Sequence, residues 1–449
     1  MSPPGNGGAE AASDSGVHAA DVLIIGGGPA GSTAAALLAR RGHRVALIEK
    51  ARHPRFHIGE SLLPANLPLF EELGVAAEVR AIGMQKLGAE FISHWDGREQ
   101  DFRFCEAWDK SMPYAYHVRR SEFDRILIRN AARAGAEIIE GARVSAVELT
   151  REPVGVQVEH EDGTQSRWQA RFLIDASGRD TFLANRLKCK QRNRRHSSAA
   201  LFGHFSGARR HAGEREGHIS IYWFDHGWFW FIPLSDGATS VGAVVWPYYM
   251  KRRTGPMQRF FLETIALCPP LAERLADAQL LNEPEATGNY SYSSAHSHGR
   301  NYLLLGDAYA FIDPVFSSGV MLAMQSAFDG TEAVDTALRR PARAAAALRA
   351  FDRRIRHGPR EFSWFIYRVT SPTMRDMFMA PRNLFRMKEA LLSMLAGDIY
   401  GATPIWGALR AFKLVYTLLS LAQPGRSARA RRLRRLNIRP AEPGPLSVS

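Results

Sequence analysis

Short apolar runs near the start of the chain predict buried strands. Residues 22–25 (VLII) form one run, and residues 44–50 (RVALIEK) form a second after an Ala/Leu-rich stretch and Gly42. Such runs are typical of strands in a parallel sheet, and the Ala/Leu-rich stretch between them predicts a helix. Similar runs in FLIDASGRD (172–180) and at the start of YLLLGDAYAFIDPVFSSGV (302–320) predict two more buried strands. The pattern therefore predicts an α/β fold.

Residues 227–233 (GWFWFIP) carry a different pattern, in which four large rings follow one another. Alternate side chains of a strand point to opposite faces, so Trp228 and Trp230 share one face and Phe229 and Phe231 share the other. Pro233 ends the run because it cannot donate a hydrogen bond to a sheet ladder. This much rigid bulk is typical of an aromatic core strand or of a wall between two compartments. The pattern alone leaves both open.

From about residue 350 the apolar residues recur at helical spacing. Residues 405–422 are apolar on one side and precede an Arg-rich tail over residues 424–449. The apolar side predicts packing against the body of the protein; contact with a membrane surface is the alternative.

The composition is that of a globular protein with two or three domains. The chain has 449 residues, of which 45% are hydrophobic and 23% are charged, and no apolar run is long enough to span a membrane. The first 20 residues predict a flexible leader, since they lack the basic start and apolar centre of a secretory signal. Three widely spaced cysteines (Cys105, Cys189 and Cys268) form neither a disulfide framework nor a metal motif. We therefore expect a cytoplasmic protein without a metal site.

The net charge of +13 is concentrated in two places. Residues 424–449 hold seven Arg and one Glu, and the cluster RLKCKQRNRR runs from Arg186 to Arg195. Neither lies within a recognisable nucleic-acid-binding module, so no nucleic acid is expected as a partner. Solvated surface is the simplest interpretation, and contact of the tail with an anionic membrane or an acidic carrier protein is the alternative.

Three glycines, Gly26, Gly28 and Gly31, form the spacing GxGxxG between the first strand and the first helix. In that context they allow a tight turn, close approach of a pyrophosphate and close packing of helix on strand. The free N–H groups at the start of the helix attract phosphates. Glu49 ends the second strand, where a carboxylate can accept hydrogen bonds from ribose hydroxyls. This unit predicts dinucleotide binding without deciding between NAD and FAD.

The later motifs indicate which dinucleotide binds, because they resemble those of a known family. HVRRSEFDRIL (117–127), FLIDASGRD and YLLLGDAYAFIDPVFSSGV stand in an order that resembles flavoprotein aromatic hydroxylases and their relatives over residues 20–340. The resemblance implies FAD, with Arg120 near the phosphates and Asp307 on the ribityl chain, and with HIGESLLP (57–64) as scaffolding beside the flavin. The cofactor contacts expected from motif and resemblance together are Gly26, Gly28, Gly31, Glu49, Lys50, Glu60, Ser61, Arg120, Asp307, Pro314 and Gly319.

The W-x-W-x-I-P pattern of Trp228, Trp230, Ile232 and Pro233 resembles that of flavin-dependent halogenases. Those enzymes make hypohalous acid from halide and O2 with reduced flavin. The resemblance implies that the two indoles form a stiff, water-excluding wall that keeps the substrate away from the flavin. A core strand remains the alternative.

Two further segments resemble halogenase sites. Lys86 in GMQKLGAEF (83–91) matches the position of a lysine that meets hypohalous acid, and apolar neighbours there would lower its pKa. An exposed lysine without a function is the alternative. FSSGV (316–320) matches a turn whose backbone N–H groups hold the halide, which implies halide contacts at Ser317, Ser318 and Gly319. A plain helix cap is the alternative there.

The predicted architecture is a Rossmann-like, glutathione-reductase-type FAD-binding domain with an inserted β-sheet substrate domain and a helical C-terminal extension. A leader covers residues 1–20, the FAD-binding domain covers residues 21–185 and 296–350, and residues 86–116 contribute to the substrate domain. The substrate domain itself covers residues 186–295, helices cover residues 351–423, and a basic tail covers residues 424–449.

The C-terminal third bears on the substrate. LLSMLAGDIYG (391–401) resembles the C-terminal part of halogenases that act on phenolic or carrier-bound substrates. Four aromatic residues before it either line the substrate tunnel or belong to the core: Phe362, Trp364, Phe365 and Tyr367.

We therefore expect an FADH2-dependent halogenase of secondary metabolism. It would act with chloride or bromide on an electron-rich, phenol- or pyrrole-like ring that is free or tethered to a carrier protein. A separate flavin reductase would supply the FADH2. The alternatives are an FAD-dependent reductase, dehydrogenase or monooxygenase acting on a polyene, prenyl or aromatic substrate, and a non-catalytic flavin-bearing accessory protein. A dehydrogenase has no use for Lys86, which separates it from a halogenase.

Overall fold

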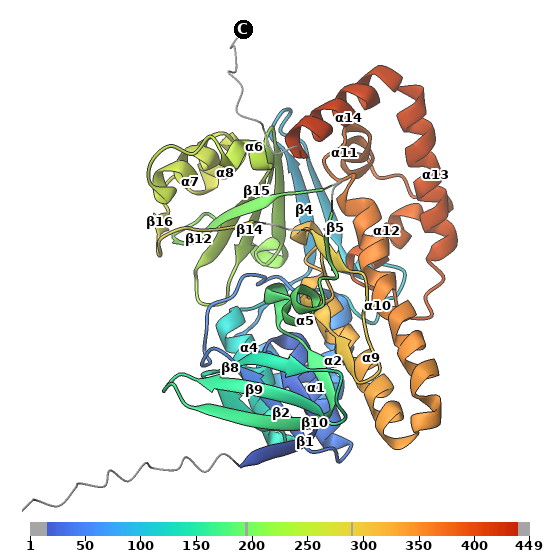
Figure 1. The fold of residues 1–449 in the computed structure, drawn as a ribbon. Coiled ribbons are helices and arrows are strands. Elements are labelled where there is room, and N and C mark those ends of the chain that lie inside the picture. Colours follow the sequence, from blue (N-terminus) through green and yellow to red (C-terminus); the bar gives the residue numbers. More distant parts are fainter. Residues whose placement is uncertain (1–15, 194–195, 289–290, 439–449) are drawn as a thin grey trace, which may run out of the picture.

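The computed structural model describes residues 16–193, 196–288 and 291–438, and two large sheets form its frame (Figure 1). The strands of the first sheet are β1 (Val17–Ile25), β2 (Val45–Glu49), β7 (Glu137–Glu140), β8 (Ala142–Glu148), β9 (Val154–His160), β10 (Gln165–Asp175) and β19 (Tyr302–Leu304). Their order is β7-β2-β1-β10-β9-β8, with β19 also beside β10. β7, β2, β1, β10 and β19 run parallel, and β8, β9 and β10 form an antiparallel meander.

Helices cover the parallel part of this sheet. α1 (Pro29–Arg40) packs against both α4 (Arg120–Arg133) and α9 (Gly319–Arg339). α1 is buried along most of its length, which its small side chains allow because they let neighbouring backbones approach closely. The shorter helices of this body are α2 (Leu67–Leu73), α3 (Ala76–Ile82) and α5 (Phe182–Arg186).

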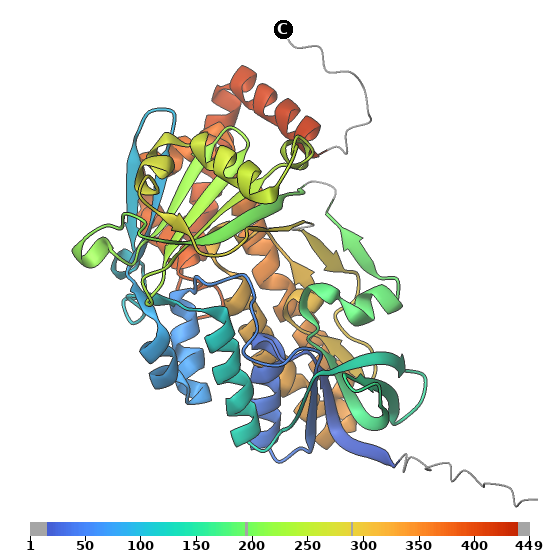
Figure 2. The same cartoon turned by 90° about the vertical axis from the view of Figure 1, so that its left-hand side faces the viewer.

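The second sheet lies above the first in Figures 1 and 2. Its strands are β4 (Gly88–Ser93), β5 (Glu99–Arg103), β12 (Ala199–Ser206), β13 (Ile219–Phe224), β14 (Gly227–Pro233), β15 (Thr239–Val245), β16 (Gln279–Leu280) and β17 (Glu285–Thr287). Their order is β16-β12-β15-β14-β13-β4-β5, with β17 beside β12. The three central strands β13, β14 and β15 are buried along their whole length, because helices cover both faces.

The two faces of the second sheet have different covers. α7 (Met257–Ala266) and α8 (Pro269–Arg274) pack on one face, near α6 (Pro247–Met250). The C-terminal helices α10 (Ala344–Ile366), α11 (Pro372–Met379), α12 (Met387–Leu395) and α13 (Trp406–Ala422) pack on the other, where they share one apolar core with the sheet. α14 (Pro424–Ile438) follows α13 at the top of Figure 1.

Short strands join the two bodies. β3 (Met84–Lys86) pairs with β6 (Ala115–His117), and Ser61 forms a bridge to His117 on the other side of β6. β11 (Lys190–Arg192), β18 (Tyr292–Ser294) and β20 (Ala310–Phe311) form a third small sheet.

The expected α/β architecture with an inserted sheet and a helical extension is confirmed. One boundary differs: β1 begins at Val17 and pairs with β10 from that residue on, so residues 17–20 are strand and the expected leader is too long. The Arg-rich tail is helical as far as Ile438, and the rest of the leader and tail lies outside the described residues. Across the described ranges, every helix is too short or too polar to cross a bilayer.

Candidate active site

A cavity of about 360 Å³ lies where the two sheets meet. Its lining comes from the glycine loop after β1, the segment before α2, the start of α4, the central strands of the second sheet and the turn before α9. Most of the residues expected at the site line it: Gly26, Gly28, Glu49, Lys50, Glu60, Ser61, Arg120, Trp228, Trp230, Ile232, Asp307, Pro314, Ser317 and Gly319. Gly31, Lys86, Pro233 and Ser318 do not line it.

The glycine loop has the geometry that its spacing predicts. Gly26 has a φ of +101°, and a Cβ there would lie 2.4 Å from the carbonyl oxygen of Ala176. A Cβ on Gly31 would lie 1.9 Å from the carbonyl oxygen of Gly26, so Gly31 lets α1 pack on the strand. At Gly28 the nearest atom is Arg55 Nη2 at 3.7 Å, which leaves room for a ligand beside the start of α1.

Glu49 is fixed at the end of β2. One carboxylate oxygen accepts from the backbone N–H of Gly27 at 2.5 Å, and the other accepts from that of Ala51 at 2.9 Å. Lys50, which also lines the cavity, forms an exposed ion pair with Asp180. The carboxylate is therefore held beside the glycine loop, where a ribose would lie.

Arg120 places a positive charge at the lining of the cavity. Its Nε and Nη2 donate to the carboxylate of Asp124 at 2.9 and 3.1 Å, and its Nη1 donates to the carbonyl of Ile58 at 2.8 Å. Burial alone would raise the pKa of Asp124, but Arg120 and Arg55 hold it below its usual range. The ionised carboxylate fixes the guanidinium in place, and the sequence pattern gave no separate signal for Arg55.

Asp307 lies on the turn after β19, and burial raises the pKa of its carboxyl group to about 6. A carboxyl group in that range can accept or donate a hydrogen bond near neutral pH, as suits a ligand hydroxyl. The open space at Gly28, the fixed Glu49 carboxylate, the Arg120 charge and Asp307 together fit the phosphates and hydroxyls of FAD.

Trp228 and Trp230 share one face of β14, with ring centroids 6.0 Å apart, and both line the cavity. The Nε1 of Trp230 donates to Ser240 Oγ at 3.2 Å. Trp228 also lines a second, small cavity of about 10 Å³ near α10. The indole of Trp228 therefore lies between the large cavity and this small void. Phe229 and Phe231 pack on the opposite face beneath α7 and α8.

One residue that packs against Trp230 was not predicted from the sequence. Gly242 pairs with Trp230 across the sheet, and a Cβ there would lie 2.2 Å from the indole ring. The glycine lets the indole lie flat on the neighbouring strand. An isolated glycine inside an apolar run is the available signal for such a close approach.

Lys86 is buried, with 1% of its surface exposed, so the interpretation as an exposed lysine is wrong. Its Nζ donates to Ser61 Oγ at 3.0 Å and to the carbonyl of Leu62 at 3.1 Å, and lies 5.3 Å from the centre of the Phe104 ring. Burial lowers the pKa of the ammonium group to about 7. Ser61 Oγ in turn lies 3.1 Å from Ser317 Oγ. A chain of hydrogen bonds therefore joins Lys86 to the turn before α9.

That turn is held in an unusual conformation. Ser317 has a φ of +57°, and α9 begins at Gly319 without a side-chain cap. Ser318 Oγ is buried and has no hydrogen-bond partner among the described residues. Asp313 fixes the turn through three hydrogen bonds. Its carboxylate accepts them from Val315 N at 3.3 Å, from Ser198 Oγ at 2.9 Å and from His196 Nε2 at 3.0 Å. His196 and Ser198 had no sequence signal.

Glu60 is buried at the cavity wall. Its carboxylate oxygens lie 3.0 and 3.1 Å from Nε2 of His204 on β12, and Arg119 is 3.9 Å away. His204 was missed because it comes from the inserted domain, far from Glu60 in the sequence.

His117 lies on the same face of the β3/β6 pair as Lys86. Its Nε2–H donates to the carbonyl of Gly217 at 2.9 Å, and its Nδ1 has no partner among the described residues. Burial, and secondarily the charge of Lys86, lower the pKa of His117 well below its usual range, so the ring is neutral.

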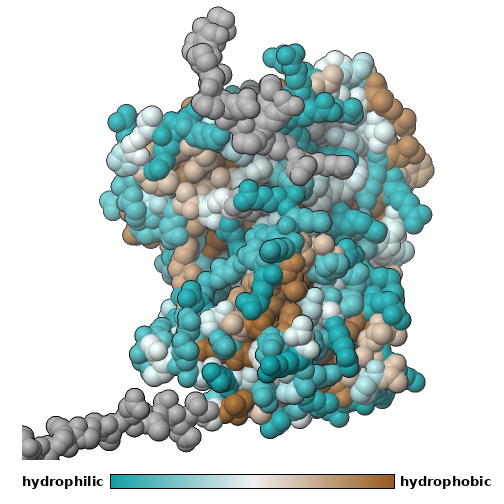
Figure 3. All heavy atoms as spheres, in the orientation of Figure 1, coloured by the Kyte–Doolittle hydropathy of each residue, from teal (hydrophilic) through white to brown (hydrophobic). Residues whose placement is uncertain are grey.

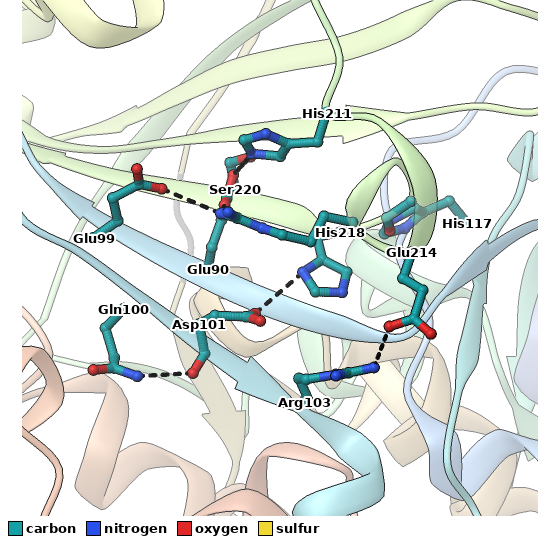
Figure 4. A network of polar contacts seen from close by, with 12 residues as sticks. Glu90, Glu99, Gln100, Asp101, Arg103, His117, His211, Glu214, His218 and Ser220 are labelled. Atoms are coloured by element: carbon teal, nitrogen blue, oxygen red, sulfur yellow. Dashed lines mark hydrogen bonds and ion pairs between the residues drawn. The ribbon is translucent and has the colours of Figure 1, made fainter.

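A wider polar network borders this strand pair (Figure 4). His218, next in the chain after Gly217, lies 3.1 Å from the carboxylate of Asp101. Buried Glu90 accepts from Ser220 and contacts His211 at 2.7 Å. The network links β4, β5 and β13 of the second sheet to the loop before β13.

The aromatic residues of α10 belong to the core. Phe362 and Phe365 are fully buried between α10 and the second sheet, while Trp364 and Tyr367 are partly buried. None of the four lines the 360 Å³ cavity. These residues therefore contribute to the core and not to the lining of this cavity.

The comparisons with known proteins agree with this site. Residues 19–356 match the family model of the FAD binding domain. A tryptophan 2-halogenase from Chondromyces crocatus is 39% identical over 313 residues; the match covers 68% of this chain but only 59% of that relative. A 1H-pyrrole-2-carbonyl-[peptidyl-carrier protein] chlorinase from Pseudomonas fluorescens is 30% identical over 85% of this chain and 90% of its own length. The structure of the myxobacterial chondrochloren halogenase CndH superposes with a TM-score of 0.75 at 34% identity, over 87% of this chain and 92% of that one.

Fold and cavity define a flavoprotein of the FAD-binding, Rossmann-like class. Within that class, the chain belongs to the family of flavin-dependent halogenases, and it is an oxidoreductase that uses FAD. The expected family, enzyme class and cofactor are confirmed.

Proposed function

We propose that this halogenase uses FADH2 from a separate reductase to make hypohalous acid from halide and O2, and transfers the halogen to a phenol- or pyrrole-like ring. The observation that carries the proposal is the position of Lys86. It is buried, donates to Ser61 at the lining of the cavity, and is linked through that serine to the turn at Ser317.

The halide is proposed to bind at the start of α9. The left-handed conformation of Ser317 turns the chain so that the backbone N–H groups of Ser318 and Gly319 begin a 21-residue helix without a side-chain cap. Free N–H groups at a helix start favour an anion. The open space at Gly319, where a Cβ would meet nothing within 4 Å, leaves room for it.

FAD, when bound and reduced, supplies together with O2 the oxidising power for the halide. The chain's own contribution is to hold the cofactor on the glycine loop, Glu49, Arg120 and Asp307, and to exclude water with the two indoles. Glu60 and Ser61 hold the segment before α2 against the cavity, and Pro314 fixes the turn that follows Asp313.

Lys86 is proposed to receive hypohalous acid. With a pKa of about 7, a large fraction of the amine is neutral near pH 7, so Nζ offers a lone pair. That lone pair either accepts a hydrogen bond from the acid or takes its halogen, in which case one N–H bond is replaced by an N–halogen bond and water leaves. The neutral His117 ring beside it adds no competing charge.

The choice of substrate follows the relatives. The chlorinase that matches along 90% of its own length acts on a pyrrole carried by a peptidyl carrier protein. We therefore propose an electron-rich ring for this enzyme, presented either free or on a carrier, and a role in secondary metabolism. We also propose a cytoplasmic location, which the three free cysteines support.

The proposal is tested with purified protein, FAD, a flavin reductase with NADH, O2 and bromide. Formation of hypobromous acid, measured by a chemical trap and dependent on bromide and on reduced flavin, is the expected result. Flavin oxidation that gives only hydrogen peroxide, at every bromide concentration, would contradict it.

A further inference from the structure

α13 carries apolar side chains on the face that points away from the protein. Leu414, Leu418 and Leu421 follow one another at helical spacing and are 59%, 56% and 65% exposed, while Leu409 and Phe412 on the other side are buried. A surface helix normally places polar residues outward. An outward stripe of leucines marks an interaction surface.

The stripe has a defined place in the molecule. α13 is the outermost helix on the right of Figure 1, and Figure 3 shows hydrophobic atoms along that upper right edge. Two ion pairs, one in the middle of α13 and one at the start of α14, hold these helices on the body: Lys413 Nζ lies 2.9 Å from Glu361, and Arg426 lies 2.5 Å from Asp376. The leucines therefore protrude from a firmly packed helix.

Positive charge adjoins the leucines. Residues 406–438 contain eight Lys and Arg and no Asp or Glu. On α14, four arginines are exposed and have no ion pair among the described residues: Arg429, Arg431, Arg432 and Arg435. Leu433 between them is 51% exposed.

We infer that α13 and α14 bind an anionic lipid surface, with the α13 leucines entering the headgroup boundary and the α14 arginines contacting the headgroups. An outward apolar helix face combined with unpaired basic residues is the composition of an interfacial, membrane-associated helix. The leucines project from the outer edge of the molecule. Lipid in a fluid bilayer can rearrange around such projecting side chains. The charge of the surface selects anionic over zwitterionic lipid. An acidic carrier protein would be attracted by the arginines but would leave the leucine stripe unexplained.

The test uses the full chain without halide or substrate, so that its outcome does not depend on the halogenase activity. Co-sedimentation is measured with vesicles of phosphatidylcholine alone and with added phosphatidylglycerol. Binding to the anionic vesicles only, weakened by salt, is the expected result. Replacing Leu414, Leu418 and Leu421 together by Ser should lower the partition coefficient at least about tenfold.

The matched control replaces three exposed leucines on other parts of the surface, Leu262, Leu267 and Leu281, by Ser and should bind like the parent. A variant with Arg429, Arg431 and Arg432 replaced by Gln keeps the leucines and should lose at least about tenfold in binding to anionic vesicles. The inference is overturned if the parent does not bind anionic vesicles, or if the two leucine variants bind equally. Self-association through the α13 leucines would also overturn it. That outcome would be a dimer that the α13 leucine variant abolishes, together with no binding of the parent protein to vesicles.

Discussion

Replacing Lys86 by Met should change the pH dependence of stability in a direction that can be worked out from the burial of this residue. In the unfolded chain the lysine pKa is near 10.5, and in the folded protein burial lowers it to about 7. Below the folded pKa both states are protonated, and the folded state carries the full penalty of a buried charge. The difference of about 3.5 in pKa corresponds to about 5 kcal/mol.

Methionine removes that penalty but also the hydrogen bonds of Nζ to Ser61 and to the carbonyl of Leu62. Each is worth about 1 to 1.5 kcal/mol. Near pH 6 we therefore expect Lys86→Met to be more stable than the parent by about 2 kcal/mol. As the pH rises from 7 towards 10.5 the penalty in the parent disappears, and near pH 10 the variant should be less stable by about 1 to 2 kcal/mol.

The assay is denaturant unfolding of the two proteins at several pH values, with Lys110→Met as the control, since Lys110 is exposed. The control should show no pH-dependent difference from the parent. A Lys86→Met variant whose stability differs from the parent by the same amount at every pH would refute a buried, titrating lysine.

Three other variants test the cavity. Gly28→Val should abolish retention of FAD, because a side chain there fills the open space beside the start of α1; a folded variant that keeps its flavin absorbance after gel filtration would contradict the placement. Trp230→Ala should lower product formed per flavin oxidised and reduce stability by about 3 to 5 kcal/mol. Gly242→Ala should also lower the amount of product formed per flavin oxidised, because the added methyl group displaces the Trp230 indole. If this ratio is unchanged in both variants, β14 is a core strand and not a barrier.

Local motifs made the nucleotide-binding half predictable. The reason is that each glycine answers a local need, since Gly26 has a positive φ, Gly31 leaves no room for a Cβ against Gly26, and Gly28 leaves space for a ligand. The two tryptophans were predictable for a similar reason, since alternation on a strand puts Trp228 and Trp230 on one face whatever surrounds them.

The supporting contacts were not predictable, because they join residues that are far apart in the chain. Ser61 brings Lys86 and Ser317 together, and His204 of the second sheet meets Glu60. No periodicity encodes such contacts; they follow from how two sheets are stacked. The sequence left the aromatic residues of α10 open between tunnel and core, since an aromatic stripe on a helix has the same pattern whether it faces a tunnel or a core.

The role of Lys86 is tested most directly by measuring two quantities on the same sample: hypohalous acid caught by a trap, and halogenated aromatic product. Lys86→Met, supplied with FAD, a flavin reductase, O2 and bromide, should still oxidise flavin and release hypobromous acid to the trap, because the residues of the halide turn and of the cofactor site are themselves unchanged. Halogenated product should fall to the level that free hypobromous acid gives in solution, while Lys110→Met retains full activity. Unchanged product formation in Lys86→Met, or loss of hypobromous acid together with product, would contradict the account.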